Sequence, residues 1–246
     1  NPTTNNTNAN LWYNGNYGFR RTQFQVRYGL TLGAVNPVVI VSAGESTKEG
    51  GLKISAGKDP DATEEVSNNW IGADNYYRIP MIQGGLKLGF LENMAVGISG
   101  FYAAFGVDRD VVSNGFSADL NLPIHQFIAL KGEFAMGTNL NNANLFTVAG
   151  SGNPDNEITT MGFWVNAISK PLDFLNIVVG FADEINTTEE LDDSDIESNM
   201  TVYGTLIFPI GKYFSLAAEY QHLMTNFKDG SGNTAGIIDI AGKVSF

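Results

Sequence analysis

The chain has 246 residues, of which 43% are hydrophobic, no cysteine and a formal net charge of −12. The absence of cysteine excludes disulfides and thiolate chemistry, and the acidic balance argues against nucleic acid as a partner, because phosphate binding needs a basic surface. No run approaches the roughly 18 apolar residues of a spanning helix, so a chain that crossed a bilayer would cross it with strands.

The first clear strand pattern follows a polar N-terminal stretch. Residues 1–19 are rich in Asn, Thr and Gly and predict an exposed loop or a partial strand. From Arg21 to Leu32 apolar and polar residues alternate, which is typical of a strand with two different faces. A second strand is predicted at Pro37 to Ala43. Residues 45–77 then lose this periodicity and carry seven acidic residues, and a loop of this length is more often functional than filler.

The remaining chain reads as a series of hairpins. Apolar residues at every second position predict strands on both sides of short turns at 91–93, 123–126, 169–173 and 209–213. The connections at 138–157, 184–198 and 225–235 are longer, polar and mostly acidic. Sorting of connections by length in this way is typical of outer-membrane barrels, with short periplasmic turns and long extracellular loops.

The sequence pattern predicts eleven strands, whereas bacterial single-chain barrels normally have an even number. We therefore predict a barrel of ten to twelve strands and favour twelve. The extra strand would lie upstream of the sequence or be a short one within residues 9–19.

The last eleven residues, Gly236 to Phe246, carry the most specific pattern. Ile238, Ile240, Val244 and Phe246 share one parity, and the chain ends on this aromatic residue. The stretch resembles the closing strand of bacterial outer-membrane β-barrels, in which the final aromatic belongs to the signal read by the assembly machinery. This resemblance names a class and no family within it.

The resemblance implies an all-β fold, a transmembrane antiparallel up-and-down β-barrel in the bacterial outer membrane. Residues 1–246 would form a single domain. Its outer face would contact lipid and lipopolysaccharide, and Phe246 would bind the barrel-assembly machinery. A homo-oligomer or a surface partner is also compatible with this class.

Aromatic residues support two membrane interfaces. One group lies near the short turns and the other toward the opposite strand ends, as expected of the two aromatic girdles of such barrels. The first group is Phe90, Phe127, Phe174, Phe214 and Phe246, and the second is Tyr102, Phe116, Phe181 and Tyr220. The alternative is the general preference of aromatics for strands.

The inward parity is rich in small and polar residues and includes ionisable ones. Ionisable groups facing an interior imply water there, because a dry buried charge costs several kcal/mol unless it is paired. The alternative is that these charges neutralise each other and fill the barrel. The candidate lumen-lining residues are Arg27, Lys87, Asp119, Lys131, Glu133, Glu219, Asp239 and Lys243.

A constriction is the sharper hypothesis. General porins resemble an arrangement in which an inserted acidic loop faces a basic wall. The candidate loop residues here are Asp59, Asp61, Glu64 and Glu65, within the loop at 45–77. The alternative is an external, solvated flap.

Catalytic, cofactor and metal sites are not predicted. His125 and His222 are the only histidines, and neither has a nucleophile or carboxylate partner in the pattern that hydrolases need. The carboxylates of the 184–198 loop are suitable ligands for calcium, but they lack the glycine and the distal glutamate of an EF-hand.

The sequence thus predicts a porin-like channel for passive diffusion of small polar solutes. The second reading is a non-conducting surface barrel that acts in adhesion, anchoring or partner binding. A third is a transporter of hydrophobic ligands, against which the polar inward face argues.

Overall fold

The computed structural model of the chain describes residues 23–44, 77–90, 93–105, 111–140, 157–188 and 191–244. These residues form one antiparallel sheet in which each strand pairs with the next along the chain. The strands are β1 (Gln23–Gly29), β2 (Val35–Gly44), β3 (Tyr77–Phe90), β4 (Met94–Phe105), β5 (Val111–His125), β6 (Ile128–Thr138), β7 (Thr159–Leu172), β8 (Leu175–Asn186), β9 (Ile196–Ile210), β10 (Phe214–Phe227) and β11 (Gly232–Val244).

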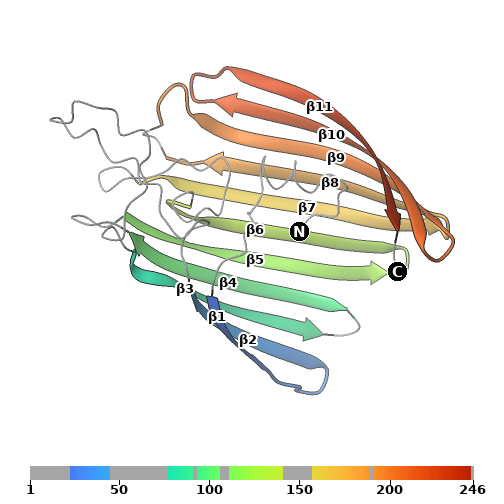
Figure 1. Cartoon of the computed structure of the whole chain (residues 1–246), viewed down its shortest axis with the longest axis horizontal. Coiled ribbons are helices and arrows are strands. Elements are labelled where there is room, and N and C mark those ends of the chain that lie inside the picture. Colours follow the sequence, from blue (N-terminus) through green and yellow to red (C-terminus); the bar gives the residue numbers. More distant parts are fainter. Residues whose placement is uncertain are drawn as a thin grey trace.

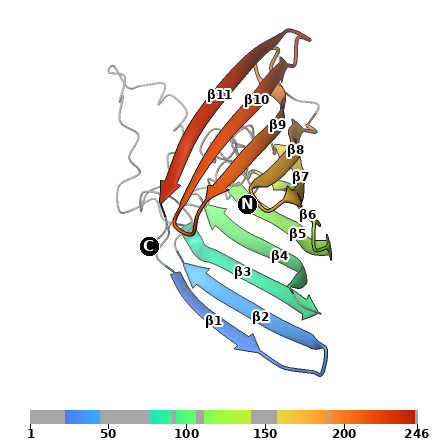
Figure 2. The ribbon, with the colours of Figure 1, turned by 90° about the vertical axis from the view of Figure 1, so that its right-hand side faces the viewer.

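The described strands form an eleven-stranded sheet that does not close on itself. The order β1 to β11 contains no crossover, and within the described residues β1 and β11 each have a partner on one side only. Figure 2 shows the sheet curving into an open trough, with β1 and β2 as one arm and β10 and β11 as the other. The predicted all-β, up-and-down fold class is confirmed, while closure into a twelve-stranded barrel stays a prediction.

The connections at one end of the sheet are consistently short. β5 and β6 are separated by residues 126–127, β7 and β8 by 173–174, and β9 and β10 by 211–213. All these turns lie at the right-hand end in Figure 1. Gly211 and Asn93 have positive φ angles of 66° and 71°, the left-handed conformation that tight hairpin turns require.

Two details of the predicted turns were wrong. Pro123, Pro171 and Pro209 belong to strand ends rather than turns, because a proline is tolerated where a ladder hydrogen bond is not required. The 225–235 connection is also shorter than predicted, since β10 and β11 extend until only residues 228–231 separate them. Register pairs such as Thr225 with Asn233 continue the ladder through this stretch, so it belongs to the sheet.

Apolar side chains lie mainly on the convex face. Ile238 and Ile240 are 78% and 79% exposed, and Phe24 is 75% exposed. The parity read from the sequence of the last strand is therefore confirmed, and these side chains do not enter a sandwich interior. Members of both aromatic groups, including Phe214, Tyr102 and Tyr220, are exposed as well. None of the described residues forms a helix long and apolar enough to cross a membrane.

Candidate functional site

The candidate site is the concave face of the trough, where the polar parity of each strand points. All eight residues predicted to line a lumen lie on this face, as the cross-strand register shows. Asp119 is opposite Glu133 on β6, Glu219 is opposite Asp239 on β11, and Lys87 is opposite Gly97 on β4. These residues share one parity along their strands, and successive side chains of a strand point to opposite sides. That they line a lumen stays a prediction.

The charges on this face are unevenly distributed among the strands. The cations Arg27 and Lys87 lie on β1 and β3. On the other arm, Glu184, Glu219 and Asp239 lie on β8, β10 and β11. Lys131, Glu133 and Asp119 lie between them on β5 and β6, and Lys243 lies near the short-turn end of β11.

Glu184 was missed by the sequence analysis, which placed it in the 184–198 loop. It lies within β8, opposite Gly162 on β7, and has no exposed surface. The signal that could have identified it was parity, since Val178, Ala182 and Glu184 share one face of β8 and are all buried.

Glu219 is held by two side chains on the same face. Thr205 on β9 donates a hydrogen bond to one carboxylate oxygen at 2.5 Å, and the Gln221 amide donates to the other at 2.6 Å. Charge-assisted hydrogen bonds of this kind stabilise a buried carboxylate. The position of Glu219 is thus fixed by its own strand and by the neighbouring one.

Glycines on the concave face allow neighbouring side chains to lie flat on the sheet. A Cβ at Gly97 would collide with the Asp119 carboxylate, and a Cβ at Gly180 would collide with the Tyr203 ring. The Tyr203 side chain lies over Gly180, and its hydroxyl accepts a hydrogen bond from the Asn166 amide at 3.1 Å. The side chains of Asp119 and Tyr203 can therefore lie along the sheet at these points.

On β6 and β7, Glu133 accepts a hydrogen bond from the indole nitrogen of Trp164 at 3.3 Å. Trp164 is its direct cross-strand partner. The bond fixes the carboxylate in the middle of the concave face.

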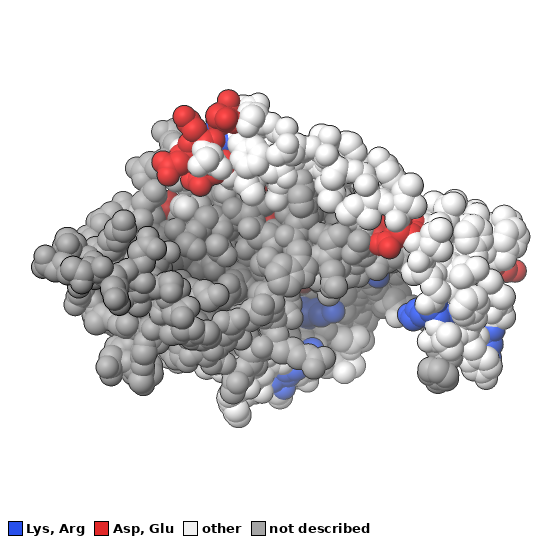
Figure 3. Space-filling view, turned by 45° about the horizontal axis from the view of Figure 1, so that its top comes forward, with Lys and Arg blue, Asp and Glu red and all other residues white. Residues whose placement is uncertain are grey.

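The acidic segment between β8 and β9 is hydrogen-bonded to the turn between β10 and β11, at the end of the sheet opposite the short turns. The Lys228 and Asp229 amides donate to the carbonyls of Asp195 and Asp193 at 3.0 and 3.2 Å. Figure 3 shows the carboxylates gathered at this end. Hydrogen bonds from the Ser231 side chain and backbone lower the pKa of Asp229. Among the described residues, no group of three His, Cys, Asp or Glu side chains could hold a metal ion.

The constriction-loop candidates Asp59, Asp61, Glu64 and Glu65 lie outside the described residues, as do residues 9–19 and Phe246. The hypotheses attached to them stay predictions.

An up-and-down antiparallel sheet with an apolar outer face and a polar inner face is the architecture of outer-membrane β-barrels. The chain has the fold of an outer-membrane channel. Among solved structures it is similar to the outer membrane channel DcaP of Acinetobacter baumannii, with a TM-score of 0.71 and 13% sequence identity over 96% of this chain and 71% of that chain. No protein-family model matches the chain, and no curated protein matches it significantly. At this identity the likeness concerns the fold.

Proposed function

We propose that the chain forms a channel of the bacterial outer membrane through which small polar solutes diffuse passively. The observation that carries the proposal is that apolar side chains are exposed on the convex face and polar ones lie on the concave face, the reverse of a soluble protein. Ile238 and Ile240 on the convex face are mostly exposed, while Glu219 and Gln221 on the concave face are 3% and 0% exposed. This pattern suits lipid outside and a polar lumen inside.

The uneven charge distribution supports polar solutes as the substrates. In a closed barrel Lys87 on β3 would lie across the lumen from Glu184 on β8 and Glu219 on β10, which would create a field that orients dipolar molecules. Such charges need water or partners, because desolvating an unpaired ion costs several kcal/mol. The similarity in fold to an outer membrane channel supports the channel function, without reference to the solute.

Liposome swelling and planar-bilayer recording test the proposal. We expect reconstituted protein to conduct ions and to admit small sugars into liposomes. Reconstituted protein that neither conducts nor swells liposomes would contradict it and favour a non-conducting surface barrel. Uptake confined to hydrophobic compounds would favour the transporter alternative.

Removal of residues 58–70 tests the constriction. If the acidic residues Asp59, Asp61, Glu64 and Glu65 face basic wall residues in the lumen, the deletion raises the single-channel conductance. An unchanged conductance would remove the constriction and leave the channel itself intact.

A further inference from the structure

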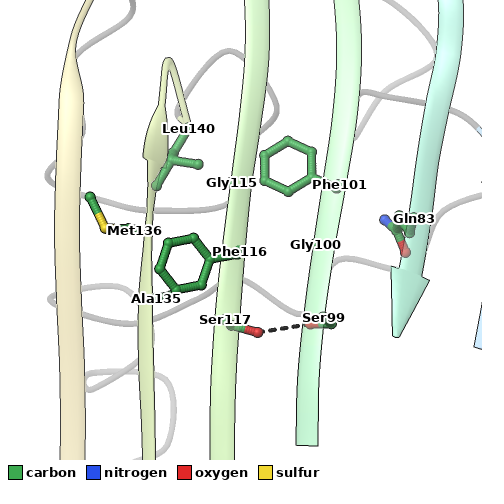
Figure 4. Close-up of a pocket in the computed structure, with 10 residues that line it drawn as sticks. All are labelled: Gln83, Ser99, Gly100, Phe101, Gly115, Phe116, Ser117, Ala135, Met136 and Leu140. Atoms are coloured by element: carbon green, nitrogen blue, oxygen red, sulfur yellow. Dashed lines mark hydrogen bonds between the residues drawn. The ribbon is translucent and has the colours of Figure 1, made fainter. Parts of the chain in front are cut away.

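A pocket of about 160 Å³ lies in the concave wall across β3, β4, β5 and β6. Figure 4 shows the residues that line it. None of these described residues is ionisable, although charged residues are close by: Lys87 lies four positions beyond Gln83 on β3, and Asp119 lies two positions beyond Ser117 on β5. The pocket is thus a neutral site on a charged wall.

The apolar part of the pocket is the ring of Phe101, which lies against Gly115. A Cβ at Gly115 would come within 2.9 Å of the Phe101 ring and 3.1 Å of a Leu140 methyl group. The absence of that Cβ lets the ring lie against the wall, where it packs on buried Leu140 and Ala135. Phe101 itself is only partly buried, so part of the ring faces the pocket.

Its polar part is a pair of hydroxyl groups. Ser99 Oγ and Ser117 Oγ are 2.8 Å apart and share one hydrogen bond. Each hydroxyl offers one donor and two acceptor sites, so the pair retains one donor and three acceptor sites for a ligand.

Gln83 contributes an amide held in place by two contacts. Its oxygen accepts from Ser42 at 3.2 Å, and its nitrogen lies 2.8 Å from the Met81 sulfur. An amide has two N–H groups and an oxygen with two lone pairs. One N–H and one lone pair therefore remain for a ligand.

We propose that this pocket is a binding subsite for neutral hydroxylated solutes, of the size of a single sugar ring. The proposal rests on the channel function proposed above and names one class of solute for it. A sugar hydroxyl both donates and accepts, which matches the mixed capacity of Gln83, Ser99 and Ser117. The C–H face of the ring matches Phe101. The volume is well below the roughly 300–1,000 Å³ of sites for drug-sized ligands, which limits the occupant to one ring.

The first experiment measures sugar-dependent block of the ionic current in planar bilayers, with D-glucose as the probe. We expect saturable block by glucose. Both Phe101→Leu and the double variant Ser99→Ala/Ser117→Ala should raise the half-blocking concentration about tenfold, equivalent to about 1.4 kcal/mol. Gluconate, which carries a carboxylate, should block less than glucose at equal concentration.

The matched control variants make the same kinds of substitution at residues outside the pocket. Ser215→Ala is a serine change in β10, whose partner across the sheet is Lys243. Phe181→Leu changes an aromatic that packs on Phe163, with ring centroids 5.6 Å apart. Neither residue lines the pocket, so both variants should be blocked by glucose like the unmodified protein. Heat-modifiable mobility in electrophoresis checks that each variant folds.

Saturation-transfer NMR with glucose and detergent-solubilised protein provides a readout independent of conduction. A glucose signal that falls in Phe101→Leu and persists in Phe181→Leu supports the subsite even if the protein does not conduct, in which case only the channel function fails. Conduction without a glucose signal, an equal loss in the controls, or binding of gluconate in preference to glucose would overturn the subsite.

Discussion

At the scale of single residues, Gly97 controls where a carboxylate can lie on the concave face. The Asp119 side chain occupies the space where a Cβ at Gly97 would be. Since the obstructing atoms are the end of a flexible side chain, Gly97→Ala should fold and rotate Asp119 away from β4. We expect the reversal potential in a salt gradient to shift in the same direction as in Asp119→Asn, toward weaker cation preference.

Gly84→Ala is the matched control for this change. A Cβ at Gly84 would meet nothing within 4 Å, and Gly84 has the opposite parity to the concave residues Gln83 and Gly85. Its reversal potential should equal that of the unmodified protein. An unchanged potential in Gly97→Ala, with a shifted one in Asp119→Asn, would show that the position of the carboxylate does not matter.

Tyr203 and Asn166 form a buried hydrogen-bonded pair. Tyr203 is 3% exposed and Asn166 1%, and the Asn166 Oδ1 atom has no hydrogen-bond partner among the described residues. Tyr203→Phe would leave the Asn166 amide nitrogen without its acceptor as well, at a cost of about 1–3 kcal/mol. Urea unfolding in lipid vesicles, followed by tryptophan fluorescence, measures this loss.

The double variant Tyr203→Phe/Asn166→Leu is the diagnostic comparison. Replacing both partners by apolar groups removes the unsatisfied amide and can be nearly neutral. We expect the double variant to be more stable than Tyr203→Phe alone. Simple additivity of the two single changes would mean that the hydrogen bond contributes nothing.

At the scale of elements, β11 places chemically opposite residues side by side. Ile238 is on the convex face and Asp239, opposite Glu219, is on the concave face. Ile238→Arg should lower the free energy of unfolding in vesicles by about 2–4 kcal/mol, the cost of a cation on the lipid face near mid-membrane. Asp239→Arg should cost far less, because its side chain faces the polar side and the Glu219 carboxylate. Equal losses in the two variants would contradict the assignment of faces.

Strand ends were predicted less well than strand faces. Prolines suggested turns at 123, 171 and 209, yet β5, β7 and β9 continue past them. Polar residues at 225–235 suggested a loop, yet Thr225 and Asn233 are register partners. A polar stretch between two strands is usually read as a loop. In this sheet the ends of β10 and β11 lie at the end with the long connections, where polar residues are equally suited to a strand.

At the scale of the whole molecule, the strand count determines how the sheet can close. Because neighbours are antiparallel throughout, β1 and β11 run in the same direction, so direct closure would create a parallel pair in an otherwise antiparallel barrel. We expect no disulfide between Val26→Cys and Ile238→Cys after oxidation. The cysteine-free sequence makes this test free of background thiols.

The pair Tyr220→Cys and Ile238→Cys is the positive control. These residues are register partners on β10 and β11, and paired strand residues have Cα separations of about 4.5–5.5 Å, within the range of a disulfide. This pair should crosslink readily, as judged by non-reducing electrophoresis. Crosslinking of residues 26 and 238 within one chain would establish direct closure and exclude an intervening strand.

The sequence by itself determined the strands, their two faces and the face on which each candidate charge lies. It could do so because the alternation of side chains is a property of the local backbone. The tertiary structure alone decided which residues are lateral neighbours: Asp119 over Gly97, Tyr203 over Gly180, and Ser99 against Ser117. Those contacts depend on the register between strands far apart in the chain, which no local periodicity specifies.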